Sequence, residues 1–373
     1  SPWVPTNDQA VETFYASCVN ESGGIILWDI VNAIETTQGI NLRDDPELVA
    51  RSKYSPDMIR KQCGQLESGG RMGNFDEVAL QQAFSKVRNM FRVGQLEPLD
   101  LGEVPYQPHT SAGLPTLRKK ADDYPRAMRE ARRIQKGKRP EPGVLFHRGK
   151  NNEHARFVNG YNFAMSLLEG RFFYPYQSAV VLHHTPYAGG RYDFELAGLL
   201  NEPRVKSRFI VEMDYSQFDS SISSKLIKMA FAIIRGNFNM NGQDEKDFDI
   251  IEKYFINTPM LAPDGYVYTG KNHGVPSGSC FTQIVDSIVN CIIIEYTARV
   301  MKFKPSRYYV MGDDVVMGVD KPLTLDAMAD VMQELGIILN IKKSRVILST
   351  EEVHFLGHDW SSFIAVRPEK ESL

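Results

Sequence analysis

The sequence predicts an α+β fold that combines an antiparallel sheet with helices. Between positions 307 and 317, two short apolar runs rich in β-branched and aromatic residues flank a Gly-Asp-Asp tripeptide, which is typical of a tight β-hairpin. Another strand-like run, residues 208–213, ends at Asp214. Apolar side chains at helical spacing occur elsewhere in the chain, so helices are expected before and after these strands.

The helices are predicted from apolar spacing and from residues that favour helix ends. Asn7 or Asp8 is a candidate cap for a first helix, and the Ser-Pro-Asp at 55–57 resembles a second helix start. Further helices are expected at 80–91, 224–238, 281–292 and 325–335. The last of these should stop at Gly336. Asp264 and Gly265 should form a hairpin turn.

Two adjacent acids, Asp313 and Asp314, are expected at the tip of the 307–317 hairpin. Neighbouring carboxylates repel each other and lose hydration, so a bound cation would make the arrangement easier to keep. An ordinary turn is the alternative, since Gly and Asp are among the commonest turn residues.

A further acid, Asp214, follows the strand-like run 208–213. A carboxylate at the end of a central strand, beside a hairpin carrying two more, is an arrangement that binds two Mg²⁺ ions for phosphoryl transfer. Asp219 comes five positions later and is better placed to bind a sugar hydroxyl than to be a metal ligand.

The segment 274–290 combines a turn at Pro276 and Gly278, with Ser277 between them, and an apolar helix. Thr282, Asp286 and Asn290 are spaced by four, so they should form one polar row along that helix. The row fits a site for a nucleotide's sugar and the template, with Gly278 on the template side. The alternative is a solvent-facing side of an amphipathic helix.

These segments resemble, in order, motifs A, B and C of the viral RNA-dependent RNA polymerases. Asp214 with Asp219 resembles motif A, the Ser277 to Asn290 segment resembles motif B, and the Gly-Asp-Asp resembles motif C. The form of motif B is most similar to that of the partitivirus and picobirnavirus group of double-stranded RNA viruses. Picornavirus-like enzymes usually have Asn where this chain has Asp286, which leaves open whether Asp286 or Asn290 helps Asp219 recognise the ribose 2′-OH.

The resemblance implies a right-handed polymerase with fingers and palm, and a thumb that is short or missing. The expected divisions are fingers with a basic channel at 1–205, palm at 206–348, and a primer-grip region with the start of a truncated thumb at 349–373. It implies RNA synthesis on an RNA template for viral replication and transcription. Asp214 and Asp313 would bind two Mg²⁺ ions, with Asp314 supporting or sharing one; Mn²⁺ is the alternative metal.

The implied partners are template and nascent RNA, ribonucleoside triphosphates and a viral capsid protein, in the host cytoplasm or inside the virion. The net charge of −3 argues weakly against nucleic-acid binding, but its distribution is uneven. Residues 116–156 contain 13 basic and 5 acidic side chains, a net charge of +8 that a phosphate-lined channel needs. A solvated helix face is the alternative for 126–138.

Four further motifs of the family have counterparts here. The small-residue loop with Ser111 and Gly113 resembles motif G, which lines the template path. The stretch 146–158 resembles motif F over the incoming triphosphate, with Arg156 the first choice for nucleotide contact and Arg148 and Lys150 the second choices.

Residues 337–344 resemble motif D, in which a lysine protonates the departing pyrophosphate. The Lys-Ser placement favours Lys343 over Lys342, and an ordinary surface lysine is the alternative. Residues 355–358, with Leu356, resemble the primer grip of motif E.

Composition is that of an ordinary soluble globular protein, with 42% hydrophobic and 24% charged residues in 373. No apolar run is long enough to cross a bilayer. The four cysteines lack metal-ligand spacing and are expected to be reduced thiols. Two other functions remain open at this point: a reverse transcriptase, which shares the palm acids, and a catalytically idle RNA-binding subunit.

Overall fold

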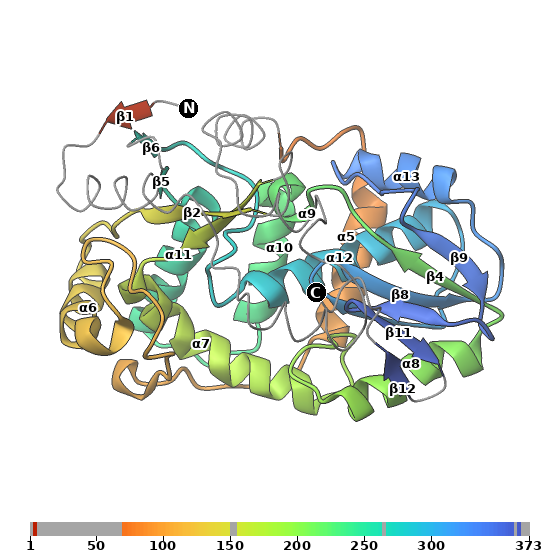
Figure 1. Ribbon diagram of the computed structural model, residues 1–373, viewed down its shortest axis with the longest axis horizontal. Coiled ribbons are helices and arrows are strands. Elements are labelled where there is room, and N and C mark those ends of the chain that lie inside the picture. Colours follow the sequence, from red (N-terminus) through yellow and green to blue (C-terminus); the bar gives the residue numbers. More distant parts are fainter. Residues whose placement is uncertain (1–2, 6–68, 150–154, 263–265, 362–363, 367–373) are drawn as a thin grey trace, which may run out of the picture.

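Figure 1 shows the fold as a computed structural model, in which the described residues form helices and three small sheets. The structure describes residues 3–5, 69–149, 155–262, 266–361 and 364–366. The described helices are α5 (Glu77–Met90), the 3₁₀ turn η1 (Leu101–Glu103), α6 (Lys120–Gln135), α7 (Phe163–Leu182), α8 (Asp193–Lys206), α9 (Phe218–Ser221), α10 (Ser224–Arg235), α11 (Gly242–Asn257), α12 (Thr282–Val300) and α13 (Leu325–Glu334).

The central sheet is antiparallel and has the order β7-β8-β4-β9. Its strands are β7 (Arg307–Met311), β8 (Asp314–Val319), β4 (Phe209–Met213) and β9 (Arg345–Leu348). A second sheet, β10-β11-β12, contains Val353–Phe355, His358–Ser361 and Ile364–Val366. The third, β1-β6-β5-β2-β3, contains Trp3–Pro5, Tyr266–Tyr268, Met260–Leu261, Gly143–Gly149 and Ala155–Gly160.

The central sheet is covered on both faces. Along β4, Val211 and Met213 point into the main core that α5, α10 and α12 also fill, while Ile210 points to a smaller cluster beneath α8. This alternation follows from the period of two in a strand. Because both faces are apolar, a one-residue slip of β4 would place Glu212 in the main core, so the register is strongly fixed.

Several element predictions are confirmed. Helix α5 has Leu80, Val87 and the following Phe91 fully buried, and α13 ends just before Gly336, whose positive φ of 79° suits a helix stop. Strands β5 and β6 pair antiparallel, although the turn at 264–265 lies outside the described residues. The helix starts predicted near positions 8 and 55 also lie outside them.

The other half of the molecule is built on α7, which packs beside α6 and α11 (Figure 1). Arg171 of α7 pairs with Asp244 at 2.7 Å and with Asp247, both on α11. All three side chains are nearly inaccessible, and Asp247 is fully buried. A buried guanidinium thus neutralises two buried carboxylates between the helices.

No described helix is long and apolar enough to span a membrane. Of the cysteines, Cys280 and Cys291 are free thiols, and the other two lie outside the described residues.

Replacing Arg171 with Ala should lower the free energy of unfolding by about 3–5 kcal/mol, because it leaves two buried carboxylates unpaired. The matched control is Arg235→Ala, which removes a more exposed pair with Asp249 and should cost about 0–1 kcal/mol. Denaturant unfolding of both variants checks this. Equal losses would contradict the expectation.

Candidate active site

The pairing of β4 with β8 brings two acids together. The last paired residues are Met213 and Val315, so the next position on each strand is an aspartate, Asp214 on one and Asp314 on the other. Opposite positions of an antiparallel pair point to the same face. The predicted meeting of Asp214 with the Gly-Asp-Asp hairpin is therefore what the fold produces.

The hairpin has the predicted two-residue turn. Met311 pairs with Asp314, which leaves Gly312 and Asp313 as the central residues. Gly312 has a φ of 66°, a left-handed conformation that favours glycine at this position. Asp313 is exposed at the tip, and Asp314 is partly buried at the start of β8.

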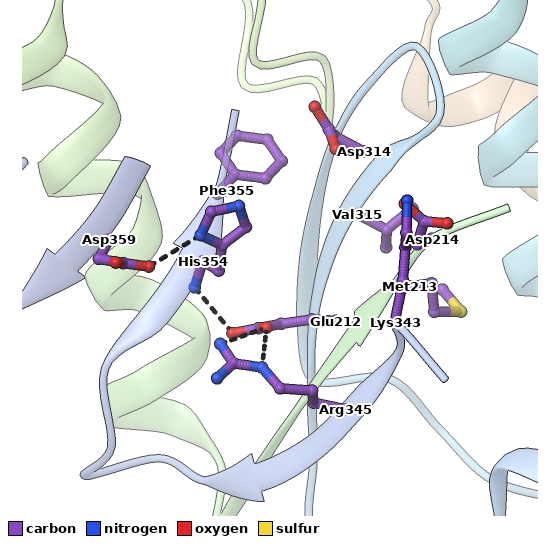
Figure 2. A pocket seen from close by; sticks show the side chains of 10 residues that line it. All are labelled: Glu212, Met213, Asp214, Asp314, Val315, Lys343, Arg345, His354, Phe355 and Asp359. Atoms are coloured by element: carbon purple, nitrogen blue, oxygen red, sulfur yellow. Dashed lines mark hydrogen bonds and ion pairs between the residues drawn. The ribbon is translucent and has the colours of Figure 1, made fainter. Parts of the chain in front are cut away.

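A cavity of about 400 Å³ opens beside these acids (Figure 2). Asp214 and Asp314 line it together with Lys343, so strand ends and the segment after α13 contribute to one site. The remaining lining residues are Glu212, Met213, Val315, Arg345, His354, Phe355 and Asp359. Lys342, the other lysine of this segment, is not among the lining residues.

The segment before β9 is held directly on the backbone of Asp214. The Asp214 amide donates to Ser344 Oγ at 3.1 Å, and the Asn340 amide donates to the Asp214 carbonyl at 2.8 Å. These bonds fix Lys343 near Asp214, because it lies between the two anchoring residues.

Glu212 connects β4 to two further strands beneath the cavity (Figure 2). Its carboxylate accepts from Arg345 Nε at 2.7 Å and from the His354 amide at 2.8 Å. Burial raises the pKa of Glu212, and these hydrogen bonds oppose the rise. One carboxylate two residues before Asp214 thus ties β9 and β10 to the strand that carries Asp214.

The polar row on α12 faces inward. Asp286 and Asn290 are buried, so the alternative of a solvent-facing row is wrong for these two residues, while Thr282 is partly exposed. Burial raises the pKa of Asp286 well above its ordinary value, and the nearby charges of Asp219 and Asp313 raise it further. Asp286 lies beside Asp219, and its Oδ1 has no hydrogen-bond partner among the described residues.

Both polar atoms of the Asn290 side-chain amide are hydrogen-bonded to other residues of the protein. Its Nδ2 donates to the carbonyls of Gly312 at 3.0 Å and Asp313 at 3.3 Å, and its Oδ1 accepts from Tyr215 Oη at 2.9 Å. Of the two candidates for assisting Asp219, Asp286 is thus the one with a side-chain oxygen that has no hydrogen-bond partner among the described residues.

The Ser277-Gly278 turn lies against β3. The Asn159 amide donates to Ser277 Oγ at 2.9 Å, and a Cβ on Gly278 would come within 1.9 Å of the Asn159 carbonyl oxygen, so only glycine fits there. Thr282 Oγ1 donates to the Pro276 carbonyl at 2.7 Å and so closes the turn at the start of α12.

Glu169 of α7 anchors the other side of this turn. Its buried carboxylate accepts from Ser279 Oγ at 2.8 Å, from the Cys280 amide at 2.9 Å and from Tyr161 Oη at 2.6 Å. Burial raises its pKa to about 7, although the hydrogen bonds oppose the rise.

The basic candidates fall on the β2-β3 hairpin. Arg148 and Arg156 are directly opposite each other in its register, and Lys150 lies outside the described residues. The motif G loop packs on the start of α7: Gly113 has a φ of 68°, and a Cβ there would lie 2.9 Å from the Tyr161 carbonyl oxygen. Ser111 is exposed in the same loop.

Leu356 stands in the turn between β10 and β11, with a φ of 55°. Its side chain packs partly against the cluster beneath α8.

Asp214, Asp313 and Asp314 fit the kind of site in which metal ions bind together with a charged substrate. Among the described residues, no group of three Asp, Glu, His or Cys side chains is close enough to enclose a metal. Mg²⁺ is usually held by one or two carboxylates with phosphate oxygens and water completing its shell. Asp214 and Asp314 in one cavity, with Asp313 at the adjoining turn, match that kind of site.

Comparison with known families agrees with this arrangement. The family model described as viral RNA-dependent RNA polymerase matches residues 151–373, more than half of the chain. This chain belongs to that polymerase family. The match includes motifs A to E and the second strand of the motif F hairpin. The predicted resemblance is confirmed.

Two relatives are RNA-directed RNA polymerases. That of Cryptosporidium parvum virus 1 (strain KSU-1) is 32% identical over 158 residues, which are 40% of this chain and 30% of that protein. That of Atkinsonella hypoxylon virus (isolate 2H) is 30% identical over 121 residues, 29% of this chain and 18% of that protein. The chain spans less than a third of the length of either relative.

The fold is similar to that of a human picobirnavirus RNA-dependent RNA polymerase. The crystal structure of its insertion-loop deletion mutant superposes with a TM-score of 0.70 at 14% identity, covering 97% of this chain and 75% of that one. The predicted right-hand polymerase fold is confirmed.

Three site residues escaped the sequence analysis: Glu169, Glu212 and Ser287. Ser287 Oγ accepts from the Gly312 amide at 2.9 Å, and it follows Asp286 directly. An acid inside an apolar strand, as at Glu212, or inside an apolar helix, as at Glu169, was the available signal, since buried carboxylates need partners.

The unfolding free energy should show a pH dependence that arises from Glu169. A folded pKa of about 7 against an ordinary value of 4.5 means that the folded state binds more protons between these values. The stabilisation is complete below pH 4.5 and is lost as the pH rises through 7, by up to about 3 kcal/mol.

Glu169→Gln removes this titration and can keep the pattern of contacts, because its Oε1 can accept from Ser279 and Cys280 while its Nε2 donates to Tyr161. Denaturant unfolding at about pH 5 and pH 8 should show a smaller difference in the variant than in the wild type. Parallel pH curves would contradict the assignment.

Proposed function

We propose that this chain synthesises RNA on an RNA template from ribonucleoside triphosphates. The observation that carries the proposal is the meeting of Asp214 and Asp314 in one cavity with Lys343. Family membership supports an RNA product over the DNA product of a reverse transcriptase. The template, the nascent strand and the triphosphates are the proposed partners. A capsid-protein contact and action in the host cytoplasm or the virion remain predictions.

In the proposed reaction the 3′-oxygen of the growing strand forms a bond to the α-phosphorus of the incoming nucleotide. The bond between the α-phosphorus and the bridging oxygen to the β-phosphate breaks, and pyrophosphate leaves. Asp214 and Asp313, with Asp314 supporting or sharing, would hold two Mg²⁺ or Mn²⁺ ions. When bound, such ions lower the pKa of the attacking hydroxyl and offset the phosphate charge. Lys343 would give a proton to the leaving pyrophosphate.

Other residues would position the substrates. Arg156, with Arg148 and Lys150, would contact the triphosphate. Ser277 and Thr282 would shape the nucleotide site. The template would run past Ser111, Gly113 and Gly278, and Leu356 would contribute to the primer grip. The divisions at 1–205, 206–348 and 349–373 remain predictions.

Ribose recognition is proposed for the Asp219 and Asp286 pair. A raised pKa favours the protonated carboxyl, and a protonated carboxyl offers one donor and one acceptor, as the amide of Asn does. Asp286 lies beside Asp219, and its buried Oδ1 has no hydrogen-bond partner among the described residues. The similar hydrogen-bonding groups of a protonated carboxyl and an amide would explain why this chain has Asp286 at the position where picornavirus-like enzymes have Asn.

Asp313→Ala should reduce templated RNA synthesis at least roughly 100-fold, because several kcal/mol of charge stabilisation is lost. Asp320→Ala is the matched control: this exposed acid lies just beyond the far end of the same hairpin and should leave the rate unchanged. The assay measures nucleotide incorporation on a defined RNA template. An undiminished rate in Asp313→Ala would remove the catalytic assignment.

Asp286→Asn should keep the preference for ribonucleotides, whereas Asp286→Ala should lower it by about 10-fold to 100-fold, since the buried polar group that assists Asp219 is lost. The measurement is the ratio of kcat/KM for CTP to that for dCTP. A ratio that is the same in the Ala variant and the wild type would exclude Asp286 from ribose selection.

A further inference from the structure

The turn that carries Asp313 is held from below by two buried side chains of α12. Ser287 Oγ accepts from the Gly312 amide at 2.9 Å, and Asn290 Nδ2 donates to the carbonyls of Gly312 and Asp313 at 3.0 and 3.3 Å. Ser287 and Asn290 are both fully buried. We call these two residues the turn clasp.

The turn clasp satisfies backbone groups that the hairpin itself does not. The central residues of a two-residue turn lie outside the strand ladder, so their amide and carbonyl groups need other partners. The partners here are side chains that are shut off from water. The clasp therefore fixes the backbone at the base of the Asp313 side chain, rather than the carboxylate itself.

The side-chain amide of Asn290 is also hydrogen-bonded to the segment that carries Asp214. Asn290 Oδ1 accepts from Tyr215 Oη at 2.9 Å, and Tyr215 is the residue next to Asp214. Tyr215 is buried and stacks on Phe218 with ring centroids 4.8 Å apart, so its hydroxyl is a fixed donor. Asn290 is thus hydrogen-bonded to the neighbour of Asp214 on one side and to the backbone of Asp313 on the other.

The required chemistry explains why this residue is Asn. One end must donate to two carbonyl oxygens and the other must accept from a phenol, and the amide does both without charge. An acid would place oxygen against the two carbonyls and add a negative charge near Asp286 and Asp313. An apolar residue of similar size would remove the donor to the two carbonyl oxygens and the acceptor for the Tyr215 hydroxyl.

We propose that Asn290, supported by Ser287, is a positioning residue that sets the separation of Asp313 and Asp214 and so determines the affinity of the pair for divalent cations. The inference rests on the proposed function, because it takes these acids as the metal ligands. It gives Asn290 a role in the metal site in place of contact with the nucleotide.

The test measures Mn²⁺ binding to the chain without nucleotide, by electron paramagnetic resonance of free Mn²⁺, together with the Mg²⁺ concentration that gives half-maximal RNA synthesis. Asn290→Leu, Ser287→Ala and Tyr215→Phe should each weaken Mn²⁺ binding, by about 10-fold or more for Asn290→Leu, the range typical for residues that orient metal ligands. The half-maximal Mg²⁺ concentration should rise in parallel. Tyr215→Phe removes the donor to Asn290 and a longer contact with Met213 Sδ while keeping the ring, so it keeps the test usable if the larger change impairs folding.

The matched control is Thr297→Val, which changes a buried polar residue on the same helix, two turns further on, whose hydroxyl has no hydrogen-bond partner among the described residues. It should leave Mn²⁺ binding unchanged. Thermal unfolding of every variant is measured alongside. Clasp variants with a lower Tm but wild-type Mn²⁺ affinity would overturn the inference, because the role would then be one of stability alone.

Asp313→Asn separates this inference from the proposed function. If Asp313→Asn loses Mn²⁺ binding while Asn290→Leu, Ser287→Ala and Tyr215→Phe all keep it, the acids bind metal and the positioning role is wrong. If Asp313→Asn itself keeps both Mn²⁺ binding and RNA synthesis, the metal assignment on which both proposals rest is wrong.

Discussion

Two like charges stand side by side at the ends of β4 and β8, and the rest of the site depends on keeping them there. Like charges at directly opposite positions of an antiparallel pair repel each other and destabilise the pair. Five residue pairs between the strands and apolar packing on both faces hold the register. The fold imposes the closeness of Asp214 and Asp314, and it makes a counter-cation favourable.

Helix α12 also helps to hold the acids in place, because its buried side chains lie against the segments that carry them. Most of its side chains are apolar and buried in the main core, which fixes the helix beneath the sheet. Its polar side chains Asp286, Ser287 and Asn290 are buried, and they therefore lie against the hairpin turn and the segment after β4, shielded from solvent. Buried polar groups need hydrogen-bond partners within the protein, and each such hydrogen bond restricts the geometry of the two groups that it joins.

Much of this arrangement follows from the sequence, and its limits have a physical cause. The hairpin, the strand before Asp214 and the helix after Ser277 are local patterns, so periodicity and turn chemistry predicted them. The ordered motifs predicted that the acids meet. The hydrogen bonds from Ser279 to Glu169, from His354 to Glu212 and from Tyr215 to Asn290 join residues 110, 142 and 75 positions apart, and local patterns carry no signal over such separations.

Spacing by four correctly grouped Thr282, Asp286 and Asn290, yet it did not distinguish their roles. A helix turns by slightly more than one full turn in four residues, so the row drifts around the axis and successive members face different neighbours. Asp286 thus lies near Asp219, whereas Asn290 lies under the hairpin turn.

The sheet β10-β11-β12 shares no strand ladder with the central sheet among the described residues, but Glu212 of the central sheet bonds to the backbone of β10. Displacement of β10 would therefore pull on the same strand that ends at Asp214, which mechanically couples the region predicted to be the primer grip to the acids proposed to bind metal.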